Sequence, residues 1–129
     1  MKFVPVLHVD KLKNQVIYLA APYSHSDPAV VERRMDVVAR VMAELMQSGV
    51  CVVSPLSFHW VGQNIRHPLD WKHFENYCMT LLSHCDAVVV VYLEGWQTSE
   101  GVTAELAQAR TTGKPCYVID YISLKISKM

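Results

Sequence analysis

The feature that most constrains the fold is a run of four consecutive valines within residues 87–93. The run shows no alternation between polar and apolar side chains, so both faces of the segment are expected to be buried. Strands that are buried on both faces are typical of parallel sheets covered by helices on each side. The valine run therefore predicts a central parallel strand.

Three other apolar segments have the length and composition of buried strands: residues 15–21, 50–54 and 115–120. Pro22 and Pro55 end the first two of them, because proline has no N–H to donate to a central ladder. A shorter apolar run at residues 3–9 is predicted to be an edge strand or an arm. The polar tail that ends at Met129 is expected to fray.

Helical patterns separate these strands. The clearest follows Asp27, a good N-cap, and Pro28, which suits the first helical position. Gly49 is predicted to end this helix with a positive φ. Two further helices are expected at residues 69–84 and 99–112, and residues 57–68 are expected to form a polar and aromatic loop. The predicted apolar stripe of the first helix consists of Val31, Met35, Val38, Met42 and Leu45.

The alternation of strands and helices predicts a small doubly wound α/β domain of the Rossmann or flavodoxin-like type. We expect a parallel sheet of four to five strands with helices on both faces. With 129 residues, the chain is expected to form one domain.

Composition argues against several classes of function. Twelve basic residues balance twelve acidic ones, which gives no broad electrostatic footprint for a nucleic acid polymer or a membrane surface. We find no apolar run long enough to span a membrane and no signal-peptide pattern, so a cytoplasmic protein is expected. Neither the six histidines nor the four cysteines show metal-ligand spacing. No metal site, disulfide or cofactor is predicted.

Ligands of open parallel sheets bind outside the carboxyl ends of the strands. Three segments of this chain occupy that position, at residues 20–25, 54–59 and 95–105. Each is richer in polar and aromatic groups than a minimal connection requires. The sequence thus predicts a binding site assembled from these three segments.

The third segment is the most informative. Ser99 is expected to start a helix whose free N–H groups suit a phosphate or hydroxymethyl oxygen, and Gly101 lets a ligand approach the backbone. Glu105 lies on the same side of that helix, beside its apolar stripe. We expect the helix dipole to hold this carboxylate ionised, and shielding from water to make it a better nucleophile. The alternative is that Glu105 is a solvated helix residue and Ser99 an ordinary N-cap.

Together these motifs resemble the nucleoside 2-deoxyribosyltransferase-like superfamily, which includes deoxynucleoside 5′-monophosphate N-glycosidases. Within it, the chain is most similar to a small bacterial and phage branch, the domain of unknown function 1937. The resemblance covers nearly the whole chain, from Tyr18 to about Ile119. The motifs that carry it are residues 18–25, Cys85-Asp86, Gly95-Trp96 and Ser99-x-Gly101-Val102-x-x-Glu105.

This resemblance implies a Rossmann-like fold in a homodimer or larger homo-oligomer, with sites near the subunit boundaries. Glu105 matches the nucleophile that attacks C1′ of the sugar, and Tyr18 matches the tyrosine that orients it. Ser99 and Gly101 match the positions that hold the 5′ end of the ligand. Ser24 and His25 fall where relatives contact a phosphate. No arginine occupies that turn, although Arg33 and Arg34 are alternatives from the following helix, unless both are ordinary surface charges.

The chain departs from its relatives at Cys78, where they carry an aspartate that assists the leaving base. A thiol is a weak donor and lacks the acceptors of a carboxylate. Asp70, His73 and Glu75 are substitutes that would require a shifted geometry, whereas Asp86 is expected to serve in packing or capping. The aromatic residues that are candidates to stack on a base, or alternatively to belong to the core or a lid, are Phe58, Trp71 and Trp96.

Two functions are consistent with these residues. The first is cleavage or transfer at the N-glycosidic bond of a nucleoside or nucleoside 5′-monophosphate, through a covalent intermediate on Glu105. The second is a non-catalytic nucleotide-binding or sensing module, which Cys78 suggests. The base, the type of sugar, the need for a 5′-phosphate and the choice between hydrolase and transferase stay open.

Overall fold

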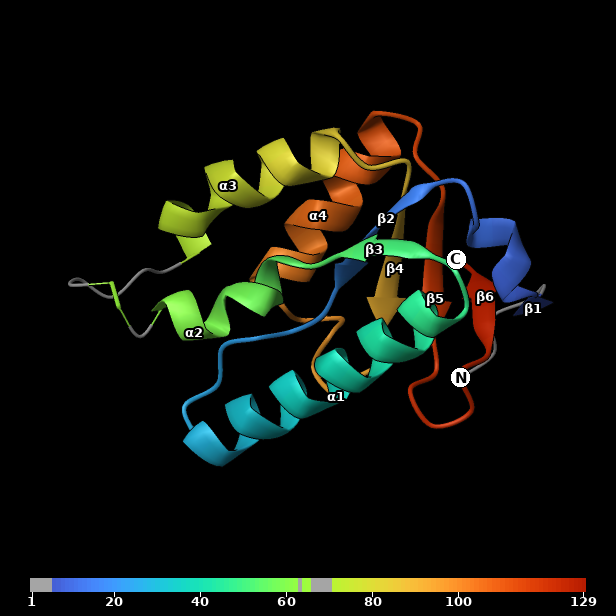
Figure 1. Cartoon of the computed structure of the whole chain (residues 1–129). Coiled ribbons are helices and arrows are strands. Elements are labelled where there is room, and N and C mark those ends of the chain that lie inside the picture. The colour runs from blue at the N-terminus through green and yellow to red at the C-terminus, as the bar shows by residue number, and fades with distance from the viewer. Residues whose placement is uncertain (1–5, 63, 66–70) are drawn as a thin grey trace.

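The computed structural model describes residues 6–62, 64–65 and 71–129, and its centre is a six-stranded sheet (Figure 1). The strand order is β1-β6-β5-β4-β2-β3. The strands are β1 (Val6–Leu7), β2 (Val16–Ala20), β3 (Cys51–Val53), β4 (Ala87–Val91), β5 (Cys116–Ile119) and β6 (Ile126–Lys128).

Four of these strands, β3, β2, β4 and β5, run parallel to one another. Every residue of β4 is buried, as the valine run predicts. The predicted doubly wound α/β fold is confirmed, with β1 and β6 adding two short antiparallel strands at one edge.

The carboxyl-terminal tail does not fray as expected, because it pairs with β5. Asp120 Oδ1 accepts hydrogen bonds from the backbone N–H groups of Ile122 and Ser123, and Leu124 adopts a positive φ of 63°. This turn reverses the chain and places Ile126 opposite Ile119. Burial of the Ile126 side chain then offsets the entropy that the tail loses on ordering.

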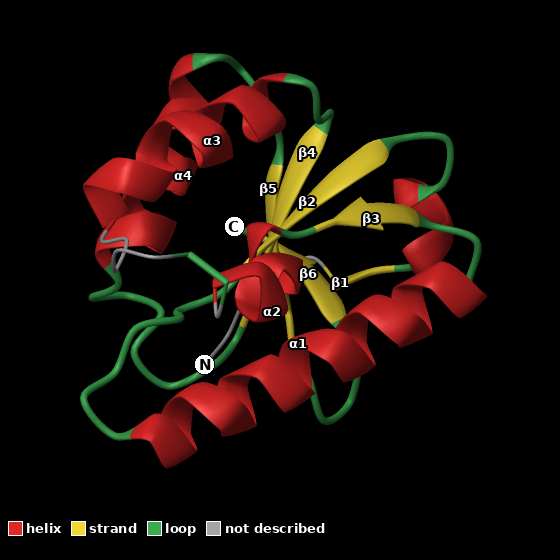
Figure 2. Ribbon diagram, turned by 60° about the vertical axis from the view of Figure 1, so that its left-hand side comes forward, coloured by secondary structure: helices red, strands yellow, loops and turns green. Residues whose placement is uncertain are grey.

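Helices cover both faces of the sheet (Figure 2). Helix α1 (Pro28–Gln47) packs on one face, and α3 (Trp71–Ser83) and α4 (Glu100–Thr111) pack on the other. The segment expected to be a loop, residues 57–68, instead begins within the 3₁₀ helix η2 (Pro55–Phe58) and continues into the short helix α2 (His59–Gly62). Another 3₁₀ helix, η1 (Val9–Leu12), precedes β2. In the described part of the chain, no helix is long and apolar enough to cross a membrane.

The predicted ends of α1 are confirmed. Asp27 accepts a hydrogen bond from the Ala29 N–H at its side chain, and Gly49 has a φ of 88°. The buried stripe lies closer to the carboxyl end of α1 than predicted, because the first part of the helix extends past the sheet. Its buried residues are Val37, Val38, Val41 and Leu45, whereas Val31, Met35 and Met42 are half-buried.

The strand order reverses between β2 and β4, and this reversal determines where a ligand fits. The chain passes from β2 outward to β3 and then crosses back to β4 on the other side of β2. The connections that leave the carboxyl ends of β2 and β4 therefore diverge to opposite faces, which opens a crevice between them.

At the other end of the strands, the Asp86 side chain accepts a hydrogen bond from the Val16 N–H at 2.7 Å, which is the capping role expected for Asp86.

Candidate functional site

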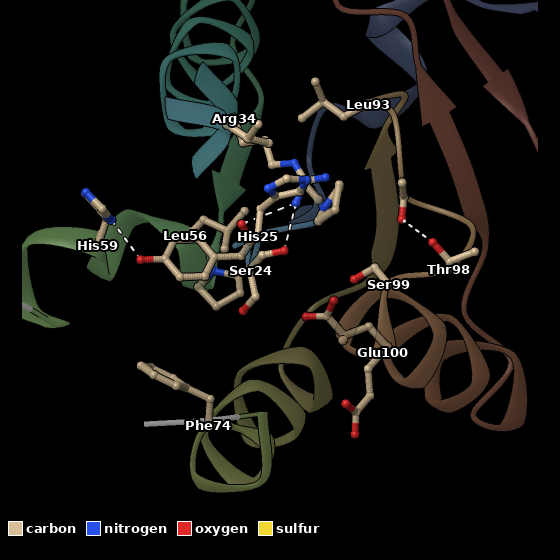
Figure 3. A pocket seen from close by; sticks show the side chains of 18 of the residues that line it. Ser24, His25, Arg34, Leu56, His59, Phe74, Leu93, Thr98, Ser99 and Glu100 are labelled. Carbon is tan, nitrogen blue, oxygen red and sulfur yellow. Dashed lines mark hydrogen bonds between the residues drawn. The ribbon is translucent and has the colours of Figure 1, made fainter. Parts of the chain in front are cut away.

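A cleft of about 1040 Å³ lies at this reversal point (Figure 3). Its walls come from the segments after β2 and β4, the first turns of α1 and α4, and parts of η2, α2 and α3. Its volume is in the range of small-molecule sites. The residues predicted from sequence that line it are Ser24, His25, Cys78, Ser99, Gly101 and Glu105.

Glu105 is the buried acid of the cleft. Glu105 is only 4% exposed. Its Oε2 accepts a hydrogen bond from the hydroxyl of Tyr18, which is fully buried. Tyr18 lies in β2 on the sheet face that α4 covers, so the two side chains meet although 87 positions separate them in sequence. The hydrogen bond engages one carboxylate oxygen and orients the other.

Burial dominates the electrostatics of this pair. It raises the pKa of Glu105 to about 7, and the hydrogen bond from Tyr18 opposes that rise only in part. Burial and then the charge of Glu105 raise the pKa of Tyr18, so its phenol remains a donor. The expectation that the dipole of α4 holds Glu105 ionised is wrong in direction. The helix dipole acts mainly within the first turn, and Glu105 lies beyond that turn. Loss of water around the buried carboxylate therefore has the larger effect on its pKa.

Cys78 completes a buried cluster with Glu105 and Tyr18. Cys78 lies in α3, and its thiol contacts the Tyr18 hydroxyl. The thiol also interacts electrostatically with the charge of Glu105. Burial, followed by that charge, raises the pKa of Cys78 to about 11. A thiol with this pKa is neutral at physiological pH and is a poor proton donor to a leaving group.

The start of α4 forms the next part of the cleft. Ser99 is the N-cap, and its Oγ accepts a hydrogen bond from the Val102 N–H at 3.2 Å, as the N-cap prediction requires. Its hydroxyl proton remains available to a ligand. Gly101 lines the cleft without a side chain, which leaves the backbone approachable. Glu100 also lines the cleft and introduces a negative charge beside these two groups.

The segment after β2 forms the facing wall. The side chains of Ser24 and His25 are exposed, and His25 Nδ1 accepts a hydrogen bond from the Asp27 N–H at 2.9 Å. This bond leaves the Nε2 edge of His25 for other contacts. Arg33 and Arg34 both line the cleft, and Arg34 also donates hydrogen bonds to backbone carbonyl oxygens.

The sequence does not predict a second polar group beside the cleft, formed by Tyr23, His59 and Glu32. Tyr23 Oη lies 2.8 Å from His59 Nδ1, and His59 Nε2 lies 3.8 Å from a carboxylate oxygen of Glu32. Tyr23 and His59 belong to two segments singled out at the carboxyl ends of strands, but nothing in their spacing indicates that the two side chains meet.

Other candidates lie elsewhere. Trp96 is half-buried against the α4-side core, contacts the ring of Tyr92 and is not among the described residues that line the cleft. Glu75 is exposed on α3 and is likewise not among them. Asp70 and the side chains of Phe58, Trp71 and His73 lie outside the described part of the structure. Among the described residues, no group of three or more His, Cys, Asp or Glu is arranged to hold a metal ion.

Comparison with families of known proteins identifies the family of this chain. The family of the domain of unknown function DUF1937 matches residues 15–121, and no curated protein matches the chain. The matched span begins just before β2 and ends just after β5, so it includes Tyr18, Cys78, Ser99 and Glu105. The whole parallel part of the sheet and the residues at the base of the cleft therefore fall within the shared domain, and the chain belongs to the DUF1937 family.

Proposed function

We propose that the protein cleaves or transfers at the N-glycosidic bond of a nucleoside or nucleoside 5′-monophosphate, with Glu105 as the nucleophile. The observation that carries this proposal is the buried Glu105 carboxyl group, hydrogen-bonded by Tyr18 and lining a cleft at the strand reversal. A carboxylate oriented in this way and shielded from water is suited to attack a sugar carbon.

The reaction would proceed in two displacements. A carboxylate oxygen of Glu105 attacks C1′ and forms a glycosyl ester, while the C1′–N bond breaks and its electron pair leaves with the base. The departing base takes a proton from water in the cleft. Water or a second base then attacks C1′, the ester bond breaks, and the Glu105 carboxylate is regenerated. An attacking water or N–H base gives up its proton to water in the cleft, which replaces the proton that the departing base took in the first step.

The electrostatics of the site support this role. With its pKa raised to about 7, Glu105 is ionised in a substantial fraction of molecules at neutral pH and is also more basic than an exposed carboxylate. Tyr18 holds one oxygen in place. Ser99 and the α4 N-terminus provide donors for the 5′ end of a ligand, in keeping with the resemblance to the nucleoside 2-deoxyribosyltransferase-like superfamily.

Cys78 favours a second candidate, a nucleotide-binding or sensing module without turnover. Among the described residues, no second carboxylate joins the cluster of Glu105, Tyr18 and Cys78, and the neutral thiol is a poor general acid. Absence of a general acid typically slows such chemistry by about 10²- to 10⁴-fold. A binding module would retain the cleft and the N-cap donors but release no base.

The deciding experiment is chromatography of free base after incubation with a panel of nucleosides and nucleoside 5′-monophosphates. Wild type is compared with Glu105→Ala and with a control, Glu44→Ala, which removes an exposed carboxylate of α1. The glycosidase proposal expects base release by wild type and the control and none by Glu105→Ala. Full activity of Glu105→Ala would refute the nucleophile, whereas thermal stabilisation by ligands without base release would support the binding module.

Cys78→Asp provides an independent test of the cluster. If the site is a slow glycosidase, a carboxyl group beside Glu105 is expected to raise base release by about 10²-fold or more. No gain in a folded Cys78→Asp variant, as judged by thermal unfolding, would indicate that the cluster is not built for departure of a base.

A further inference from the structure

Arg34 links the two segments that form opposite walls of the cleft. From α1, its Nη1 donates hydrogen bonds to the carbonyl oxygens of Ser24 at 3.0 Å and Tyr23 at 3.3 Å. Its Nη2 donates to the carbonyl oxygen of Glu94 at 3.1 Å. Figure 3 shows the Arg34 side chain reaching from α1 to the space beside Ser24 and His25. One guanidinium group thus joins the connection after β2 to the connection after β4.

Gly95 makes room for this contact. Its φ of +92° is a conformation that side-chain-bearing residues rarely adopt, and a Cβ there would lie 3.0 Å from Arg34 Nη2. The guanidinium therefore packs directly against the backbone of the turn that leads to Ser99 and α4. A lysine has a single ammonium group and lacks the planar fork that bonds both segments at once.

We infer that Arg34 is a positioning residue that sets the spacing between the Ser24 wall and the Glu94–Ser99 wall of the cleft. Three of its N–H donors are engaged by backbone carbonyls, so its primary role is to hold the two connections together rather than to bind an anion. This role extends the proposed function but does not depend on it, because the contacts exist in the free protein.

The first test is amide hydrogen exchange without any ligand. The Trp96 N–H, bonded to the Leu93 carbonyl, reports on the turn after β4, and the Asp27 N–H, bonded to His25, reports on the wall after β2. In Arg34→Gln, both amides are expected to exchange faster, on the order of tenfold. Arg33→Gln is the matched control, because Arg33 lines the same cleft from the neighbouring position on α1.

A pair of glycine variants separates the contact from backbone strain. Gly95 and Gly113 both have positive φ, but a Cβ at Gly113 would meet nothing within 4 Å. Alanine at either position is strained, whereas only Gly95→Ala also crowds the Arg34 guanidinium. We expect faster exchange of the Asp27 amide in Gly95→Ala and no change there in Gly113→Ala. Adding Gly95→Ala to Arg34→Gln is expected to accelerate the Asp27 amide no further.

The second readout is ligand affinity, which distinguishes positioning from anion binding. A positioning Arg34 predicts that Arg34→Gln weakens a nucleoside and its 5′-monophosphate by similar factors, and that Arg34→Lys does not rescue either. Exchange within twofold of wild type at both amides in Arg34→Gln would overturn the inference. Loss of affinity for the monophosphate alone would also overturn it and would identify Arg34 as a phosphate ligand. If no nucleoside binds to wild type, the proposed function fails while the exchange test still decides the role of Arg34.

Discussion

Glu105→Gln is expected to make the protein more stable at and above neutral pH. In the wild-type protein, burial raises the pKa of Glu105 from its ordinary value of 4.5 to about 7. The folded state therefore binds a proton more tightly than the unfolded state does. As pH rises above 4.5, the carboxyl group ionises first in the unfolded chain, and this ionisation lowers the free energy of the unfolded state relative to the folded state. Glutamine does not titrate, and its amide oxygen still accepts a hydrogen bond from Tyr18.

The magnitude follows from the difference between the two pKa values. That difference is about 2.5 pH units, and each unit corresponds to about 1.4 kcal/mol. Wild type is thus expected to lose about 3 kcal/mol of unfolding free energy, relative to Glu105→Gln, as pH rises from 4.5 to above 7. The loss levels off once the folded carboxyl is ionised. This loss is the cost of keeping an ionisable carboxyl group out of water.

The assay is urea unfolding at half-unit intervals from pH 4.5 to 8.5, analysed by linear extrapolation. The difference between wild type and Glu105→Gln cancels the titration of every group that the substitution leaves unchanged. Glu44→Gln, which removes one carboxylate at an exposed position of α1, is the matched control. A difference for Glu105→Gln that changes by less than about 1 kcal/mol over this range would refute the raised pKa and with it the buried carboxyl site.

Substitutions at three further positions test the surroundings of the site and the fold. Tyr18→Phe removes the hydrogen bond that lowers the pKa of Glu105. The pH at which the unfolding free energy declines is therefore expected to rise above its wild-type value, and an unchanged pH would contradict the contact. Asp27→Ala removes the N-cap of α1 and is expected to cost about 1 kcal/mol in urea unfolding, with Asp27→Ser recovering most of it. Leu82→Ala, at a fully buried position of α3, is expected to cost about 2–5 kcal/mol, and a cost below 1 kcal/mol would contradict its place in the core.

The sequence alone determined the elements whose causes are local. The valine run identified β4 as a strand buried on both faces, and the cap formed by Asp27 and Pro28 located the start of α1. Ser99 was recognisable as the residue that begins α4, because N-caps depend on bonds a few residues away. The spacing from Ser99 to Glu105 also indicated the candidate site, since one helix carries both residues.

Only the tertiary structure decided what surrounds those residues. The cluster of Glu105, Tyr18 and Cys78 joins α4, β2 and α3, and burial there reverses the expected direction of the pKa of Glu105. Likewise, the Arg34 bridge requires the connections after β2 and β4 to lie side by side, and β6 forms because a turn returns the tail to β5. Periodicity and caps report on neighbours along the chain. Desolvation and hydrogen bonds across the sheet depend on how distant segments pack, and local pattern does not encode that packing.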